Sequence, residues 1–238
     1  MIGNARTADE QDHAFLATGA GMLDLGTLGG QYSYAYGINN YGQVVGNSQT
    51  ATGQAHCFLY SGGVMSDIGT LGGAGCFAAA INDAGQVTGV SSGSTGGRAF
   101  IYNGRTMTDL GTLGGSTSAG KAINQAGQVV GVARTANNEQ HGFIYTGTRM
   151  VDMGTLGGTS STPTAINIKG QVVGNSTLAN GVKQPFFYSN GIMVNLNTVL
   201  PQLSNIDPAR IYLNDAGQIA GTGTINGQQR AFLLTPTP

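Results

Sequence analysis

Four aspartates stand at one place in a repeated motif, and a ring of such carboxylates could bind cations. Each opens a block of the form Asp-apolar-Gly-Thr-Leu-Gly-Gly, and they are Asp24, Asp67, Asp109 and Asp152. An aspartate before a glycine-rich turn also accepts hydrogen bonds from the turn backbone. Equivalent acids in separate repeats lie too far apart to share one ion. We therefore predict that these aspartates cap turns.

The Gly-Thr-Leu-Gly-Gly loops that follow are rich enough in glycine to cradle a phosphate. They lack the Gly-Lys-Ser/Thr ending of a phosphate-binding loop and are followed by no helical pattern. Because the loop recurs in every complete copy, a structural role is predicted.

The histidines His13, His56 and His141 are candidate metal ligands. They fall at one repeat position, and other copies hold Arg98, Gln184 and Arg230 there. Metal ligands must converge on one ion, whereas these side chains are distributed along the repeats. We expect a long polar side chain at the start of a strand.

The Asn-Asp-Ala-Gly-Gln segments resemble part of a calcium loop. The alternating acids of such a loop are missing, and Asp83 and Asp215 are replaced by Asn40, Gln125 and Ile168 in other copies. A tight turn, with glycine at positive φ, is the prediction.

Residues that break the repeat are better candidates for a binding site. Tyr32, Tyr34 and Tyr36 are predicted on one face of one strand, with Tyr41 in the following turn; other copies carry Gly75, Phe77 and Ala79, or Thr117, Ala119 and Lys121. Such an aromatic patch suits a sugar, an apolar ligand or a partner protein, although ordinary packing is the alternative. Tryptophan, a common stacking platform for sugars, is absent.

Catalytic chemistry has little support in the residues. Outside the repeat and turn positions the remaining acids are Asp9, Glu10, Asp12, Glu139 and Asp207. No Cys-His or Ser-His-Asp constellation can be argued from them. No cofactor and no metal site are predicted, and an enzyme with a pocket at the mouth of the fold is kept as an alternative.

The elements that must position these residues recur about every 43 residues. Each copy has four short runs rich in Val, Ile, Phe and Tyr, separated by Gly, Asn, Asp and Ser, which indicates strands. We name them the AIN strand (such as residues 33–38), the VVG strand (44–47), the HAF strand (56–60) and the DLG strand (64–67). The AIN strand has one face of small residues, so we place it innermost and the DLG strand outermost.

The fold expected is all-β, a β-propeller of four-stranded blades over residues 1–238 as a single domain. The first copy lacks its AIN strand and the last lacks its DLG strand. Six blades, with the first and last incomplete, are preferred over five blades with surplus strands. An upstream DLG segment would complete the ring, so the closure seam is expected to be weak.

The recurring DLGTLGG, INxxGQVVG and HAFLY blocks, with His13-Ala14-Phe15 as one example, resemble the bacterial HAF-repeat proteins. The resemblance covers nearly the whole chain. It implies an extracellular or periplasmic location and brings no site residues with it. The usual signal peptide of the family is not visible at the start of this sequence.

Composition limits the partners. The net charge is −1 and only 9% of residues are charged, so no basic nucleic-acid footprint is present. No apolar stretch is long enough to span a membrane. Cys57 and Cys76 replace small residues of other copies, and two buried free thiols are expected rather than a disulfide. The function expected is a non-catalytic secreted or cell-surface scaffold that binds a protein, glycan or small ligand, with an enzyme and a lectin as alternatives.

Overall fold

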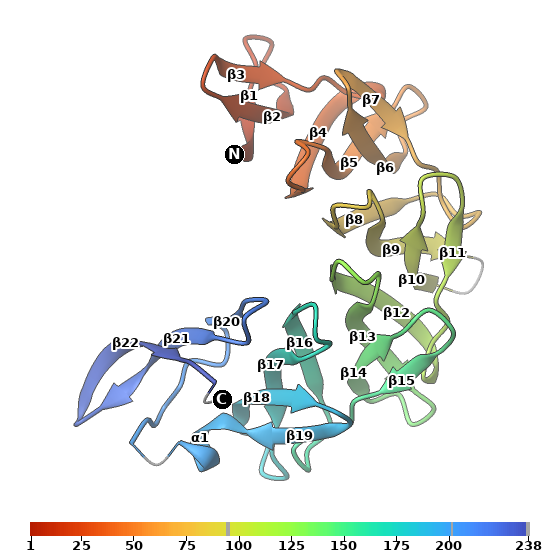
Figure 1. Cartoon of the computed structure of the whole chain (residues 1–238). Helices are drawn as coiled ribbons and strands as arrows, with labels where there is room; N and C mark the ends of the chain where they lie inside the picture. The colour runs from red at the N-terminus through yellow and green to blue at the C-terminus, as the bar shows by residue number, and fades with distance from the viewer. Residues whose placement is uncertain (94–95, 201, 237–238) are drawn as a thin grey trace. The chain divides into compact units, whose positions relative to one another are not determined.

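The computed structural model describes residues 1–93, 96–200 and 202–236, and it is built almost entirely of β-strands (Figure 1). Its six sheets each contain three or four antiparallel strands. The all-β prediction is therefore confirmed. The described residues contain one short helix, α1 (Leu196–Val199), and no helix long and apolar enough to cross a membrane.

The first three sheets have the strand orders β1-β2-β3, β4-β5-β6-β7 and β8-β9-β10-β11. Their bounds are β1 (Ile2–Arg6), β2 (Asp12–Thr18), β3 (Gly21–Asp24), β4 (Gly29–Ile38), β5 (Val44–Thr50), β6 (Ala55–Ser61), β7 (Val64–Asp67), β8 (Cys76–Ile81), β9 (Val87–Gly93), β10 (Gly96–Tyr102) and β11 (Met107–Asp109).

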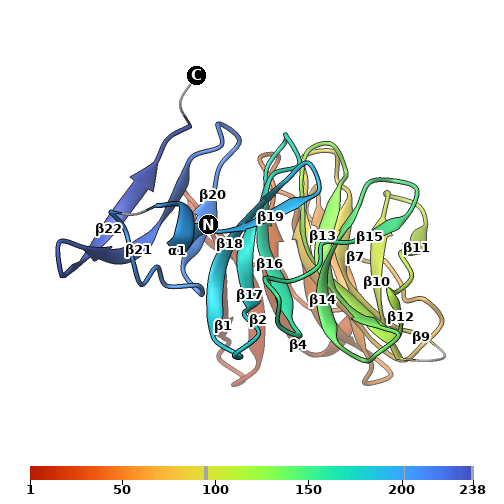
Figure 2. The ribbon, with the colours of Figure 1, turned by 90° about the horizontal axis from the view of Figure 1, so that it is seen from below.

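The other three sheets have the orders β12-β13-β14-β15, β16-β17-β18-β19 and β20-β21-β22. Figure 2 shows the strands β16 to β18 side by side, with β20 to β22 in a separate sheet. Their bounds are β12 (Gly114–Ile123), β13 (Val129–Thr135), β14 (Gln140–Tyr145), β15 (Met150–Asp152), β16 (Ser161–Ile166), β17 (Val172–Thr177), β18 (Lys183–Ser189), β19 (Ile192–Asn195), β20 (Ile211–Leu213), β21 (Ile219–Ile225) and β22 (Gln228–Leu234).

Every four-stranded sheet has its AIN strand at one edge and its DLG strand at the other, as the repeat predicts. Among the described residues, the first sheet has no AIN strand and the last has no DLG strand, which is also as predicted. The chain packs into two compact units, one of Met1–Gly111 with Thr117–Gly120 and one of Thr112–Ser116 with Lys121–Pro238.

The turns between AIN and VVG strands are held by the Asn-Gln pair of the motif. Asn39 Oδ1 accepts from the amide of Gln43 at 3.0 Å, and Asn39 Nδ2 donates to Gln43 Oε1 at 2.7 Å. Gly42 has a φ of 74°, a conformation that favours glycine. Asn39 Nδ2 also donates to the carbonyl of Asn82, 43 residues later. The Asn-Gly segments are therefore turns, as predicted, and they join successive copies.

Phenylalanines of the HAF strand pack against the preceding sheet in both units, as Phe58 and Phe100 do in one and Phe186 does in the other. Phe58, Phe100, Phe143 and Phe186 have no exposed surface. Phe58 packs with Ala14 and Leu25 of the preceding copy and with Ala35 of its own. Burial of a phenylalanine contributes about 1.5–3 kcal/mol, so these rings are a main source of cohesion between sheets.

A serine on the AIN strand forms the polar link between sheets. Ser33 Oγ accepts from the amide of Ala14 at 2.9 Å and donates to the carbonyl of Gly26 at 2.6 Å. Ser118 bonds the amide of Ala99 in the same way, also at 2.9 Å. The serine and the alanine are 19 positions apart in the sequence. The serine hydroxyl gives a hydrogen-bond partner to the backbone amide of an alanine that is fully buried.

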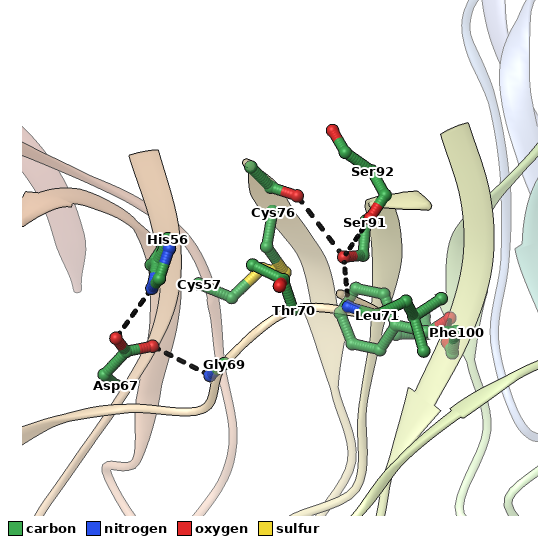
Figure 3. The surroundings of a disulfide bond; sticks show 12 residues. His56, Cys57, Asp67, Gly69, Thr70, Leu71, Cys76, Ser91, Ser92 and Phe100 are labelled. Atoms are coloured by element: carbon green, nitrogen blue, oxygen red, sulfur yellow. Dashed lines mark hydrogen bonds and ion pairs between the residues drawn. A yellow bond between two sulfur atoms is a disulfide. The ribbon is translucent and has the colours of Figure 1, made fainter. Parts of the chain in front are cut away.

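The prediction of two free thiols is wrong, because Cys57 and Cys76 form a disulfide between β6 and β8 (Figure 3). Their sequence separation is also 19 residues. Cys76 stands where other copies place the bridging serine, and Cys57 stands where they place Ala14 or Ala99. Both side chains are fully buried. Comparing the repeats within the sequence shows that both positions usually hold small residues. It does not show that the two positions face each other.

Candidate functional site

Tyr32 and Tyr34 of β4 lie on the strand face opposite the packed one, and Tyr36 follows them along the strand. Ser33 and Ala35 are buried, at 0% and 8% exposure, and the tyrosines alternate with them. Tyr32 and Tyr34 are half-buried, whereas Tyr36 is 53% exposed. The predicted placement on one face of a single strand therefore holds for Tyr32 and Tyr34, which alternate with the buried residues.

A β-bulge shapes this part of β4. Ala35 pairs with Gly46 and Gly37 pairs with Val45, so Tyr36 is the extra residue between them. A bulge redirects the side chain it carries. Gly46 allows the close approach, because a Cβ there would overlap the Tyr34 carbonyl and the Phe58 ring. The bulge recurs at Ala79 and Thr164, and of these three bulges the one in β4 carries an aromatic ring.

A charged pair from the first sheet adjoins the tyrosines. The Tyr34 hydroxyl donates to Asp12 Oδ2 at 3.1 Å, and Arg6 Nε lies 3.6 Å from Asp12 Oδ1. The hydrogen bond to Asp12 raises the pKa of Tyr34, with smaller contributions from burial and from the neighbouring phenols of Tyr36 and Tyr32. Tyr34 therefore stays a neutral donor over a wide pH range.

The rings of Tyr32 and Tyr34 contact each other, with centroids 5.6 Å apart and planes tilted by 41°. Arg6 also lines a hollow of about 270 Å³ on the first sheet, whose wall includes His13, Phe15 and Asp24. The junction of the first two sheets thus carries two partly exposed rings, then a carboxylate and then a guanidinium. We call Tyr32, Tyr34, Tyr36, Asp12 and Arg6 together the tyrosine face.

The same junction in a later copy carries an ordinary polar pair. Gln140 Nε2 and Thr162 Oγ1 are 3.3 Å apart and, like Asp12 and Tyr34, are 22 residues apart in sequence. The tyrosine face is therefore a local specialisation of a contact that the repeat already makes. This common separation is the sequence signal that pairs Asp12 with Tyr34.

Tyr41 does not join the ring contact of Tyr32 and Tyr34. It lies in the turn between β4 and β5, is 76% exposed, and its amide donates to Asn39 Oδ1 at 3.1 Å. Asp12 and Arg6 take part instead, and sequence reasoning missed them because both come from the preceding sheet.

The aspartates of the DLG blocks cap turns, as predicted. Asp24 Oδ1 accepts from the amide of Gly26 at 2.8 Å, and Asp109 Oδ1 accepts from Gly111 at 2.8 Å. Burial raises the pKa of Asp24, but the Gly26 amide and His13 outweigh it and the net pKa is lowered. The loops are closed internally, since Thr27 Oγ1 donates to the carbonyl of Gly30 at 2.9 Å.

Sequence reasoning missed that the histidine and aspartate positions pair with each other. His13 Nδ1 lies 2.9 Å from Asp24 Oδ2, His56 Nδ1 lies 2.7 Å from Asp67 Oδ2, and His141 Nδ1 lies 2.8 Å from Asp152 Oδ2. Each pair joins the HAF strand to the DLG strand beside it. The pairs are 11 residues apart, and that constant separation is the signal in the sequence.

The His-Asp pair recurs in three copies, which indicates a structural role. A catalytic pair would be expected in a single copy, with a nucleophile beside it. Among the described residues, no group of three or more His, Cys, Asp or Glu side chains is arranged to hold a metal ion. The tyrosine face, in contrast, offers aromatic surface with polar groups beside it, which is the chemistry of binding.

No protein-family model matches the chain, and no curated protein matches it. Among solved structures, it is similar to a variant of Aleuria aurantia lectin in complex with alpha-methyl-L-fucoside, at 11% identity and a TM-score of 0.43, covering 97% of this chain and 85% of the other. It is also similar to the SapL1 lectin in complex with alpha methyl fucoside, at 14% identity and a TM-score of 0.40, covering 87% of this chain and 82% of the other.

Proposed function

We propose that this protein is a non-catalytic glycan-binding protein and that the tyrosine face is its binding site. The single observation that carries the proposal is the Tyr34–Asp12–Arg6 arrangement beside the Tyr32 ring. The flat faces of tyrosine rings suit the C–H surface of a sugar ring. The carboxylate and the guanidinium, which form charge-assisted hydrogen bonds, suit its hydroxyl groups.

Glycan is preferred over a partner protein because the charged groups lie against the rings rather than around them. A protein interface excludes charge from its centre, whereas here Asp12 contacts Tyr34 directly. A sugar, with hydroxyl groups and C–H faces on one ring, matches both kinds of group at once.

The test is a glycan array followed by calorimetric titration of the best glycan, with alpha-methyl-L-fucoside among the soluble probes. Tyr34→Ala and Asp12→Asn should each weaken binding about tenfold or more, as expected for loss of a central contact. Tyr212→Ala is the matched control, because Tyr212 is 64% exposed on β20. A glycan whose affinity is unchanged in both site variants, or an array with no hit, would refute the proposal.

We also propose that the six sheets are blades of one β-propeller domain over residues 1–238, and that the chain is a HAF-repeat protein. The repeated Ser33–Ala14 type of link and the buried HAF phenylalanines support this. A chain of this length in one compact domain has a radius of gyration of about 18 Å. Small-angle scattering that gives a clearly larger value would refute the single compact domain.

An extracellular or periplasmic location is part of the proposal. The disulfide between Cys57 and Cys76 supports it, because disulfides persist in oxidising compartments. Labelling of intact cells with an antibody, compared with permeabilised cells, tests this directly.

A further inference from the structure

The outer edge of β22 is the place where the last sheet differs most from the complete ones. In those sheets a DLG strand pairs with the HAF strand, and β22 (Gln228–Leu234) is the HAF strand of the last sheet. Within the described part of the chain, no strand pairs with this edge (Figure 1). An unpaired strand edge is a template for another extended chain.

The complete sheets define what such a strand must look like. In each DLG strand an acid or asparagine lies opposite the HAF phenylalanine and a methionine lies opposite the residue two positions further on. The cross-strand pairs are Phe15 with Asp24 and Ala17 with Met22, Phe58 with Asp67 and Tyr60 with Met65, Phe100 with Asp109 and Tyr102 with Met107, Phe143 with Asp152 and Tyr145 with Met150, and Phe186 with Asn195 and Tyr188 with Met193. In β22 the equivalent positions are Phe232 and Leu234.

A surface hollow borders β22 and is lined by both Phe232 and Leu234. Its volume is about 380 Å³, and its wall includes Leu203, Ile225, Phe232 and Leu234. In the second and fifth sheets the corresponding methionines, Met65 and Met193, pack against Tyr60 and Tyr188. The hollow is thus lined mainly by apolar residues, and its wall includes Leu234, the residue that a methionine of an added strand would oppose.

Charge at this edge is complementary to the acid of the pattern. Arg230 is at the repeat position of His56 and Arg98, whose partners are Asp67 and Asp109. Arg230 is exposed, and its guanidinium contacts the side-chain oxygen of Gln228. An acid opposite Phe232 would stand next to Arg230, as Asp109 stands next to Arg98.

We propose that β22 binds an extended peptide segment by strand addition, and that the segment carries Met-x-Asp-Leu or a close equivalent. Its aspartate pairs with Arg230, its methionine fills the hollow, and the residue after the aspartate donates its amide to the carbonyl of Ala231. The last contact copies the amide of Leu110, which donates to the carbonyl of Ala99 at 2.9 Å. Main-chain bonds supply affinity and alternate side chains supply specificity in this mode of recognition.

The probe is a fluorescein-labelled peptide of residues 106–113 of this chain, Thr-Met-Thr-Asp-Leu-Gly-Thr-Leu, titrated with the full protein by fluorescence anisotropy. Arg230→Glu should weaken binding by about tenfold, because an attraction becomes a repulsion. A peptide carrying Asp109→Lys should bind the Arg230→Glu protein better than the wild-type protein. Arg210→Glu is the matched charge reversal, since Arg210 precedes β20 at the opposite edge of the same sheet.

Methylation of peptide amides tests the strand pairing itself. Methylation at Leu110 removes the amide that donates across the edge and should abolish binding. Methylation at Asp109 should be tolerated, because Asp109 and Phe100 form a non-hydrogen-bonded pair and its amide points away. No binding of the unmodified peptide to protein with a normal melting curve would overturn the proposal. So would binding that is unaffected by Arg230→Glu or by methylation at Leu110.

Discussion

The disulfide between Cys57 and Cys76 occupies the position at which a serine hydroxyl links neighbouring sheets elsewhere in the chain. The covalent link and the hydrogen bond join the same two strand positions, one on the HAF strand and one on the following AIN strand. The chain therefore carries two chemical solutions to one junction, and they can be exchanged experimentally.

Replacing the disulfide by the serine link should lower the free energy of unfolding less than removing the disulfide without a replacement. Cys57→Ala with Cys76→Ala removes a cross-link of 19 residues, which should cost about 3 kcal/mol of unfolding free energy. Cys57→Ala with Cys76→Ser restores the residues of the other copies and should recover about 1 kcal/mol through one buried hydrogen bond. Urea unfolding of both double variants measures the difference. Equal stability of the two would contradict an interchangeable junction.

Removing a serine link should be costly where the serine is buried. Ser118→Ala leaves the amide of Ala99 without its partner, and an unsatisfied buried donor costs about 1–3 kcal/mol. Ser116→Ala is the control on the same strand, because Ser116 is exposed. Chemical denaturation should separate the two variants, and a Ser118→Ala protein as stable as the control would argue against the link.

The turn aspartates should matter as hydrogen-bond acceptors more than as charges. Asp109→Ala loses the bond from the amide of Gly111 and should cost about 1 kcal/mol. Asp109→Asn keeps an acceptor oxygen and should cost less. The fifth copy has Asn195 at this position, and its Oδ1 accepts from the amide of Asn197 at 3.0 Å. Thermal unfolding in which Asn is as harmful as Ala would show that charge dominates.

The pKa of Tyr34 gives a pH test of the tyrosine face. Its hydrogen bond to Asp12 raises the pKa, so the stabilisation it brings is fully present below the unfolded value of about 10. That stabilisation is lost as pH rises through the folded pKa. Asp12→Asn should lower the pKa of Tyr34 toward its ordinary value. The phenolate absorbance of each protein, minus that of its Tyr34→Phe version, isolates this group.

Local chemistry explains why most of the fold could be predicted from sequence. Apolar runs such as residues 56–60 are bounded by turn residues, and the separation of Asp24 from Asp67 shows the repeat directly. The strand order followed from the small residues of the AIN strand. These features can be read directly from the order of residues, so no knowledge of how neighbouring sheets pack was required.

The side-chain contacts between strands could not be predicted in the same way. The disulfide, the His13–Asp24 type of pair and the Asp12–Tyr34 bond depend on which strand positions face each other, and sequence alone does not give that geometry. Tyr34 was identified because it departs from the repeat, whereas Asp12 was regarded only as a leftover acid. Constant separations of 19, 11 and 22 residues mark these contacts once the structure is known.

The asparagine side chains of the turns donate hydrogen bonds that all point from one copy to the following one. Asn39 donates to the carbonyl of Asn82, Asn124 to that of Asn167, and Asn167 to that of Asn214, so each bond runs from one copy to the next. The acceptor is a backbone carbonyl, which every copy has whatever its side chains. Tandem duplication of the gene segment could therefore lengthen the array without a compensating mutation, because a newly added copy would already carry the acceptor that its predecessor needs.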